Sequence, residues 1–327
     1  MKMRFDRSLS LLILLAGSVP LQSPAVASDF PTRQVQIVVP YTPGATVDIV
    51  ARIFAAKLSS YWGQPVIVDN RPGASTTLGA KLVAQGQPDG YTLLFSTSET
   101  FTVVPHMAQH RSFQPMAELR PINVLATLTN AIVVNPSLPV ATLSELIAHA
   151  RANPGTLRYS SPGHGSNVHL AMEMLNSLAK IGIQHVPYRG LAPATTAVLT
   201  NEVQIGQAGY SGRDLVESGR LKAIAIAGSE RLPAFASVPT TAEAGYGKVD
   251  SSTWLIIAAP AKTPKEILGK IDSDLSRALN DPDMRQELTD RRGLAIMNIG
   301  WDKAVVQLDR RAKEGAEMVQ VSGADRE

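Results

Sequence analysis

The residues best suited to chemistry in this chain form a short turn between a predicted strand at Val35–Val39 and a predicted helix at Val47–Tyr61. The turn has five residues: Thr42, Pro43, Gly44, Ala45 and Thr46. A helix that begins just beyond a strand aims unpaired backbone N–H groups, and the positive end of its dipole, at the space beyond the sheet. That arrangement suits an anion, although many such turns carry Gly and Pro for steric reasons alone. We expect Thr46 to cap the helix and Asp48 to lie favourably in its first turn.

Two more polar loops follow predicted strands, at Thr92–Phe95 and Leu157–Ser160. The first loop offers hydroxyls and one acid: Ser96, Thr97, Ser98 and Glu99. Consecutive hydroxyls can orient a carboxylate or hold waters that do so, and a plain turn stabilised by its own hydroxyls fits the pattern equally well. The second loop offers Gly163, His164, Gly165, Ser166, Asn167 and His169. Ser166 or Asn167 can cap the helix that follows, which leaves nearby N–H groups and hydroxyls to face a cleft.

No catalytic or cofactor site is predicted. The sequence contains no cysteine, which excludes thiol catalysis, and Gly209-Tyr210-Ser211-Gly212 has the wrong spacing for a nucleophile elbow. The two glycines of the second polar loop lack the third glycine and the ribose-binding acid of a dinucleotide fingerprint. The pairs His106/His110 and His164/His169 lack the glutamate of a zinc hydrolase helix and have no evident third ligand. We therefore expect neither an enzyme nor a metal or other cofactor.

Charge and composition favour a globular α/β protein without a nucleic acid partner. The chain has 327 residues, 44% of them hydrophobic, which is enough for two α/β lobes or one large domain. The formal net charge is +3, and Lys2, Arg4 and Arg7 with Asp6 account for most of it. Aromatic residues make up only 5% of the chain, and no basic stripe is interleaved with them.

The first residues are typical of an export signal. A basic start is followed by the apolar stretch Leu9–Leu21, which is too short to span a bilayer, and by the small-x-small pattern Ala25-Val26-Ala27. We expect cleavage near Ala27-Ser28 and a periplasmic location, with an uncleaved anchor as the alternative. Ser18 stands where a lipoprotein would have its cysteine, so no lipid anchor is predicted.

Short apolar runs alternate with helical patterns along the rest of the chain, which is typical of parallel α/β architecture. The last strand pattern, Ser251–Pro260, is followed by three helical patterns and too few strands for a separate domain. We therefore predict a tail that returns to the first lobe. The expected division is a signal peptide at 1–27, a discontinuous lobe one at 28–130 plus 255–327, and lobe two at 131–254. Two chain crossings would then border a cleft that can close on a ligand.

Several runs of residues in this order and spacing resemble the Bug family, the extracytoplasmic solute receptors of tripartite tricarboxylate transporters. The resemblance extends over nearly everything from residue 30 to about 320. The matching runs include Val38-Val39-Pro40-Tyr41, Asp48-Ile49-Val50-Ala51-Arg52, Asn70-Arg71-Pro72-Gly73-Ala74, Pro88-Asp89-Gly90-Tyr91-Thr92-Leu93-Leu94 and His185-Val186-Pro187-Tyr188.

The resemblance implies a two-lobed type II periplasmic binding fold without catalysis. Receptors of this family hold a small carboxylate in the cleft between the lobes, by backbone amides, hydroxyls and ordered water rather than by an arginine. The implied partners are a small-molecule carboxylate and the membrane subunits of a tripartite tricarboxylate-type transporter, and the implied state is a monomer. A sensory receptor of the same fold, which presents its ligand to a histidine kinase, stays open as an alternative.

The resemblance also locates the candidate binding loops and the departures from the family pattern. The implied loops are Pro43–Asp48, Ser96–Thr100 and Ser160–His169. Ala45 and Thr46 stand where glycines are usual, and Glu99 stands where a small polar residue is common. A third departure replaces an aromatic-acid-asparagine run and makes Gln207 and Tyr210 candidates for ligand contact, since Tyr210 can stack on a ring or donate its hydroxyl.

Overall fold

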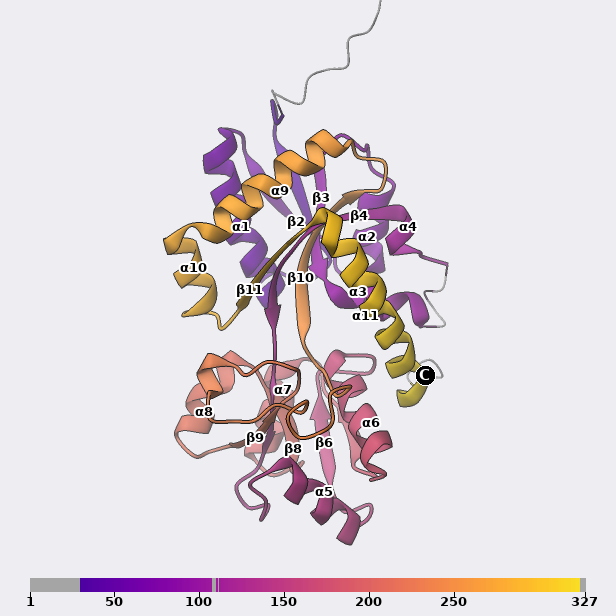
Figure 1. Ribbon diagram of the computed structural model, residues 1–327, viewed down its shortest axis with the longest axis vertical. Helices are drawn as coiled ribbons and strands as arrows, with labels where there is room; N and C mark the ends of the chain where they lie inside the picture. The colour runs from indigo at the N-terminus through magenta and orange to yellow at the C-terminus, as the bar shows by residue number, and fades with distance from the viewer. Residues whose placement is uncertain (1–29, 108–109, 111, 324–327) are drawn as a thin grey trace, which may run out of the picture.

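The structure is a computed structural model that describes residues 30–107, 110 and 112–323. Two β-sheets lie one beyond the other along its long axis, each flanked by helices (Figure 1). The first sheet has the order β11-β4-β10-β3-β1-β2 and comprises β1 (Val35–Val39), β2 (Val66–Asn70), β3 (Thr92–Thr97), β4 (Leu119–Leu128), β10 (Thr253–Pro260) and β11 (Ala295–Gly300). The second has the order β7-β6-β8-β5-β9 and comprises β5 (Ala131–Val134), β6 (Arg158–Ser161), β7 (Gln184–Pro187), β8 (Ile205–Ala208) and β9 (Lys222–Ile226). The expected α/β class is confirmed.

The helices cover both faces of each sheet. The longer ones are α1 (Thr46–Trp62), α2 (Thr77–Ala84), α5 (Leu143–Ala152), α6 (Asn167–Ala179), α7 (Leu191–Leu199), α9 (Lys265–Asn280), α10 (Pro282–Thr289) and α11 (Trp301–Ser322). Three are short: α3 (Ser98–Thr102), α4 (Pro115–Glu118) and α8 (Arg213–Glu217). Strand β1 is covered on both sides, because Ile37 and Val39 pack with α1 and α9 while Val38 packs with α2 and α11. The consecutive apolar residues Ile37, Val38 and Val39 are the pattern that such a strand requires, and Gln36 is its one polar residue.

The chain passes between the two sheets twice, and the two passages lie side by side. The first leads from β4 through Thr129 and Asn130 into β5, and the second leads from the segment after β9 into β10. Strands β4 and β10 pair in antiparallel fashion, with Leu128 opposite Thr253. The two sheets are therefore joined by neighbouring strands of one ladder rather than by separate flexible linkers.

This pairing turns the carboxyl ends of the central strands of both sheets toward the passages. At the first sheet, Thr97 ends β3 opposite Leu255, near the start of β10. At the second sheet, Ala208 ends β8 opposite Ala131, the first residue of β5. In each sheet, successive parallel strands are added on opposite sides of a central one, β1 in the first and β6 in the second. Ligands of open α/β sheets bind at the carboxyl ends of the strands at such a switch point, and here two switch points face each other.

Helix α11 packs against both sheets. Ala304 and Leu308, near its start, belong to the core of the first sheet, whereas Met318 and Val319 belong to the core of the second. Figure 1 shows this helix descending from the first sheet to the flank of α6. Lys248, on the segment that returns from the second sheet, pairs with Glu317 of α11 at 2.6 Å. The C-terminal segment thus forms a noncovalent link beside the two covalent passages.

The structure adds two strands that the periodicity did not predict. Strand β4 contains Pro121, whose missing N–H weakens a strand prediction, and its pairing with β10 shifts register close to that residue. Strand β11 lacks an alternating pattern and is half-buried throughout. Both occupy the side of the first sheet where the tail returns. The predicted signal peptide lies outside the described residues, and no helix among residues 30–323 that the structure describes is long and apolar enough to cross a membrane.

We expect Gly315→Ala to destabilise the protein, because a β-carbon at this position of α11 would lie 2.0 Å from the carbonyl oxygen of Thr102 in α3. Overpacking of this kind costs about 1–3 kcal/mol, which outweighs the helix propensity of Ala, about 1 kcal/mol. Gly269 in α9 is the matched control, since a β-carbon there would meet nothing within 4 Å. Gly269→Ala should raise the urea midpoint while Gly315→Ala lowers it. Equal midpoints for the two variants would contradict the close packing of α11 on α3.

Candidate functional site

The α1 loop, residues 42–46, leads from the carboxyl edge of the first sheet into α1. Gly44 has φ +83°, a left-handed conformation that costs any residue with a β-carbon. Ala45 is the N-cap and makes no side-chain hydrogen bond to the helix. Thr46 is the first helical residue rather than the predicted cap, because the Gly44 turn ends one residue earlier than expected. The first N–H groups of α1 therefore have no side-chain cap from Ala45 and no partner within the helix.

Asp48 holds the α1 loop in place. Its Oδ2 accepts from the Gly44 amide at 2.8 Å and from Arg52 Nε at 3.1 Å, and its Oδ1 accepts from Asn70 Nδ2 at 2.9 Å. The side chain is buried. Burial alone would raise the pKa of Asp48, but the hydrogen bonds from Arg52, Gly44 and Asn70 outweigh it and hold the pKa below its usual range. Both oxygens are thus used inside the protein, which makes Asp48 a positioning residue for the loop.

The hydroxyls of the α3 loop, residues 96–99, are also buried and engaged. Ser96 Oγ lies 2.7 Å from Thr100 Oγ1, and Thr97 Oγ1 lies 2.7 Å from the Tyr41 hydroxyl. Ser98 Oγ accepts from the backbone N–H of Trp254 at 3.1 Å. Burial, with a contribution from the nearby Glu99 charge, raises the pKa of the Tyr41 phenol, which therefore stays protonated. These bonds tie the end of β3 to β1 and β10 and give the loop one shape.

A chain of hydrogen bonds connects the helix starts of the two sheets through the second passage. Thr253 Oγ1 donates to Glu99 Oε1 at 2.8 Å and accepts from Asn167 Nδ2 at 3.1 Å. Asn167 also donates to the carbonyl oxygen of Ser252 at 3.2 Å. Glu99 belongs to the first turn of α3 and Asn167 to the first turn of α6. Glu99, a predicted ligand-binding residue, is therefore also part of the link between the sheets.

The α6 loop, residues 162–166, closes on itself through Ser166. As the N-cap of α6, Ser166 accepts from the His169 amide at 3.3 Å, and its hydroxyl donates to the Gly163 carbonyl at 2.7 Å. Of the two caps that the sequence allowed, Ser166 is the one observed. The Gly165 amide donates to Nδ1 of His169 at 3.1 Å. Backbone groups of this loop are thus held at the carboxyl end of β6.

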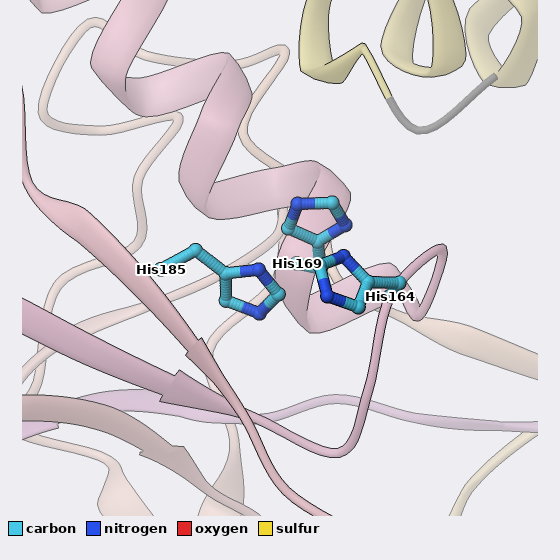
Figure 2. Close-up of side chains that lie close together, drawn as sticks. All are labelled: His164, His169 and His185. Atoms are coloured by element: carbon cyan, nitrogen blue, oxygen red, sulfur yellow. The ribbon is translucent and has the colours of Figure 1, made fainter. Parts of the chain in front are cut away.

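His185, which the sequence analysis did not connect with His164 and His169, lies beside both of them (Figure 2). Its ring stacks on that of His169, with centroids 4.0 Å apart, and meets the His164 ring edge-on at 4.9 Å. Burial, together with the charges of His169 and His164, lowers the pKa of His185 to about 3. The His185 imidazole is therefore neutral at ordinary pH.

Gln207 carries a buried donor that is not used by the protein. Its Oε1 accepts from Ser251 Oγ at 2.6 Å, which fixes the side-chain amide at the end of β8. Among the residues that the structure describes, its Nε2 is buried and has no hydrogen-bond partner. A buried N–H left without a partner costs about 1–3 kcal/mol. A ligand oxygen would satisfy this donor.

Tyr210 reaches from the second sheet to the first. Its hydroxyl donates to the carbonyl oxygen of Asp290, just after α10. Its ring lies directly over Gly293, where any β-carbon would come within 2.2 Å of it. The predicted hydroxyl donor is thus present, but in this structure its partner is the opposite lobe.

Three of the predicted residues, Thr46, Tyr210 and Asn167, line two different cavities. Thr46 and Tyr210 share one of about 500 Å³, together with Ile49, Leu128, Leu191, Arg213, Arg291 and Arg292. The three arginines pair with acids of their own helical segments, at Glu217 and Glu287. Asn167 lines a second cavity of about 340 Å³ on the α11 side, with Trp254 and Arg311. The α1 and α8 sides of the molecule therefore form one chamber, and the α6 and α11 sides form another.

Several positioning residues were missed from the sequence. Asn70 belongs to the Asn-Arg-Pro-Gly-Ala run, and its side chain bonds both Asp48 and the Tyr41 carbonyl oxygen, so the motif itself was the available signal. Thr253 stands in a polar stretch before the apolar run at residues 254–260. Nothing in that polar stretch indicated a link between the lobes. Arg213 and Arg292 are far apart in the sequence, and only the fold brings both to the wall of one cavity.

Comparison with known proteins places this architecture in one family. The family model described as "Tripartite tricarboxylate transporter family receptor" matches residues 50–316. A protein of Bordetella pertussis from the group called UPF0065 is 35% identical over 277 residues, which cover 84% of each chain. Protein BugT of the same organism is 31% identical, over 85% of this chain and 86% of its own.

Solved structures agree with the sequence relatives. R. palustris Rpa4515 with adipate aligns with a TM-score of 0.78 at 29% identity, over 90% of this chain and 99% of its own. MatC from Rhodopseudomonas palustris with bound malate aligns with a TM-score of 0.74 at 29% identity, over 89% and 100%. The expected periplasmic binding fold and the Bug-type resemblance are confirmed, and the family is one of ligand-binding receptors rather than enzymes. The chain belongs to the tripartite tricarboxylate transporter receptor family.

Proposed function

We propose that this protein captures a small organic carboxylate between its two sheets and delivers it to the membrane subunits of a tripartite tricarboxylate-type transporter. The observation that carries the proposal is that the two switch points face each other across the paired passages. Ligands in open α/β sheets are held at such points. Closure of one lobe on the other would bury a ligand held there.

The donors at these switch points suit an anion. Helices α1 and α6 both begin at the carboxyl edge of their sheet, so their first N–H groups and their dipoles favour negative charge there. The unpartnered Nε2 of Gln207 adds a buried side-chain donor near the passages. Because the hydroxyls of the α3 loop are engaged with protein partners, we assign ligand contact chiefly to backbone amides and Gln207, and loop shape to Asp48, Ser96 and Ser98.

The bound acids of two relatives support the same ligand class. Rpa4515 was solved with adipate and MatC with malate. In the present chain, Arg213, Arg291 and Arg292 stand at the cavity that Thr46 lines, where their charges are balanced by Glu217, Glu287 and Asp214. We propose that the ligand carries at least one carboxylate, with its remaining part in this cavity against Ile49 and Leu191.

The remaining features of the proposal concern processing and assembly. We propose that the signal peptide is removed near Ala27-Ser28, that the mature protein works in the periplasm without a lipid anchor, and that it acts as a monomer. We take the two sheets as the two lobes that close, with lobe one at 28–130 plus 255–327 and lobe two at 131–254. We propose no nucleic acid partner.

Binding of a carboxylate should raise the melting temperature, since a ligand at about 100 times its Kd stabilises the folded state by about 2.7 kcal/mol. We expect such a shift with at least one acid in a panel of mono- and dicarboxylates that includes malate and adipate. In Gln207→Glu, the new carboxylate keeps an acceptor for Ser251 but removes the free donor, so calorimetry should show affinity reduced about 10- to 100-fold. Gln204→Glu is the control, because Gln204 lies just before β8, at the end away from Ala208, and its side-chain oxygen accepts from the Arg158 amide, a bond that a glutamate can keep. The absence of a shift across the panel would refute carboxylate binding.

Asp48→Asn should weaken both the fold and ligand affinity, because the neutral amide loses its charge pairing with Arg52 and cannot accept from every present donor. We expect a stability loss of about 1–3 kcal/mol at pH 7 and roughly tenfold weaker binding. Since the folded-state pKa of Asp48 is depressed, its contribution is complete above the unfolded value, about 3.9, and is lost as the pH falls through the folded pKa. Denaturation of both proteins from pH 7 to pH 3 measures this difference. Asp69 lies on β2 and bonds Gln36 and Arg71. The control Asp69→Asn removes this acid and should leave ligand affinity unchanged.

Delivery is tested by the partner that retains the protein. Membrane subunits of a tripartite tricarboxylate-type transporter, in detergent, should retain the ligand-loaded chain more strongly than the ligand-free chain. Retention by the ectodomain of a histidine kinase, with none by the transporter, would replace delivery by the sensory function and leave carboxylate binding intact.

A further inference from the structure

Three histidines converge at one corner of the second sheet, beside the start of α6. Each offers one ring nitrogen, and the three nitrogens lie within 4.8 Å of one another. His164 is exposed, His185 is half-buried and His169 is buried. Figure 2 shows the rings approaching from the α6 loop, from α6 and from β7.

The fold brings these residues together from three elements. Strands β6 and β7 pair in parallel with Tyr159 beside His185, so that the His185 ring stacks against Tyr159 at 4.9 Å. Strand β6 then leads through the loop that carries His164 into the first turn of α6, where His169 lies. Sequence spacing alone could pair only the last two histidines.

We propose that His164, His169 and His185 form a binding site for one divalent transition metal ion, with Zn²⁺ as the probe. Neutral imidazoles are favoured ligands of Zn²⁺, Ni²⁺ and Cu²⁺, and three histidines with an open fourth position are a known zinc donor set. Zn–N bonds of about 2.0–2.1 Å place tetrahedral ligands about 3.3 Å apart. The ligand atoms must therefore close in by up to about 1.5 Å. Because the His169 and His185 rings are stacked nearly parallel, one of them must also turn its ring plane toward the ion, and the exposed His164 on its loop can follow.

A hydrogen bond between Ser161 and His185 orients one of the rings. Ser161 Oγ lies 2.6 Å from Nε2 of His185 and also accepts from the Gly163 amide at 3.1 Å. Metal-bound histidines are usually held by a hydrogen bond at their other ring nitrogen, which selects the tautomer. In the tautomer in which Nε2–H of His185 donates to Ser161 Oγ, whose own hydroxyl can donate to the Gly163 carbonyl oxygen, Nδ1 is left as the ligand atom.

Metal binding has a consequence for the α6 loop. The Gly165 amide donates to Nδ1 of His169, so the neutral ring now carries its proton on Nε2. A metal at Nδ1 displaces this amide, and a metal at Nε2 requires a proton on Nδ1, which can no longer accept. Either route breaks the bond and frees the Gly165 N–H. The metal site does not depend on the proposed function. Only the further step, in which the freed Gly165 N–H binds the acid ligand, rests on it.

The test is titration of the untagged, chelator-treated full chain with ZnCl₂ by calorimetry. We expect one Zn²⁺ per chain, at least tenfold weaker binding in His164→Ala and in His185→Ala, and unchanged binding in His149→Ala, a histidine of α5 outside the cluster. X-ray absorption of the zinc-loaded protein should show three nitrogen ligands at about 2.0–2.1 Å. Hydrogen exchange of the peptide that contains Gly165 should increase on loading.

The design keeps a folding defect from obscuring the result. His164 is exposed, so His164→Ala decides the question if His185→Ala proves misfolded by circular dichroism. Failure of the wild-type chain to bind stoichiometric Zn²⁺, or equal weakening by His149→Ala, overturns the metal site. Carboxylate binding, measured separately in chelator, would stand in that case.

Discussion

The pairing of β4 with β10 is the constraint on which the rest of this structure depends. Leu128 and Thr253 face each other at the point where both passages leave the first sheet. Because the two strands are hydrogen-bonded neighbours, both passages leave the first sheet side by side. The same pairing turns the carboxyl ends of β3 and β8 toward one another. Every group assigned to ligand capture stands at one of those edges, so the hinge and the site share one origin.

Polar side chains near the site divide into those that shape it and those left to bind. Asp48, Ser96 and Ser98 each use their side-chain oxygens in hydrogen bonds to neighbouring loops and strands. Because these side chains are buried, they need such bonds: a buried polar group without a partner is costly. Gln207 differs from these three, because its Oε1 accepts from Ser251 while its buried Nε2 has no partner in the part of the chain that the structure describes. A rigid polar frame around a few unused donors fits a receptor that must bind and release an anion without chemistry.

Contacts on both flanks set how the lobes can move. Helix α11 joins the cores of both sheets on one flank, and Tyr210 bonds the Asp290 carbonyl on the other. The chain Glu99–Thr253–Asn167 adds a link at the passage itself. Opening of the lobes would have to break the bond between Tyr210 and Asp290 while α11 slides or bends. The strength of these contacts therefore sets how easily the lobes open.

The sequence alone determined the α/β class, the strand at Val35–Val39, the anion-suited loops and the receptor family, because these depend on local periodicity and contiguous motifs. Only the tertiary structure decided which polar residues face a partner, because that depends on neighbours far along the chain. Asp48 proved to hold its loop through Asn70, and Glu99 to bond Thr253. Strand β11 escaped prediction since its half-buried face has no alternation. His185 joined His164 and His169 only through the register of β7 on β6, which no linear spacing encodes.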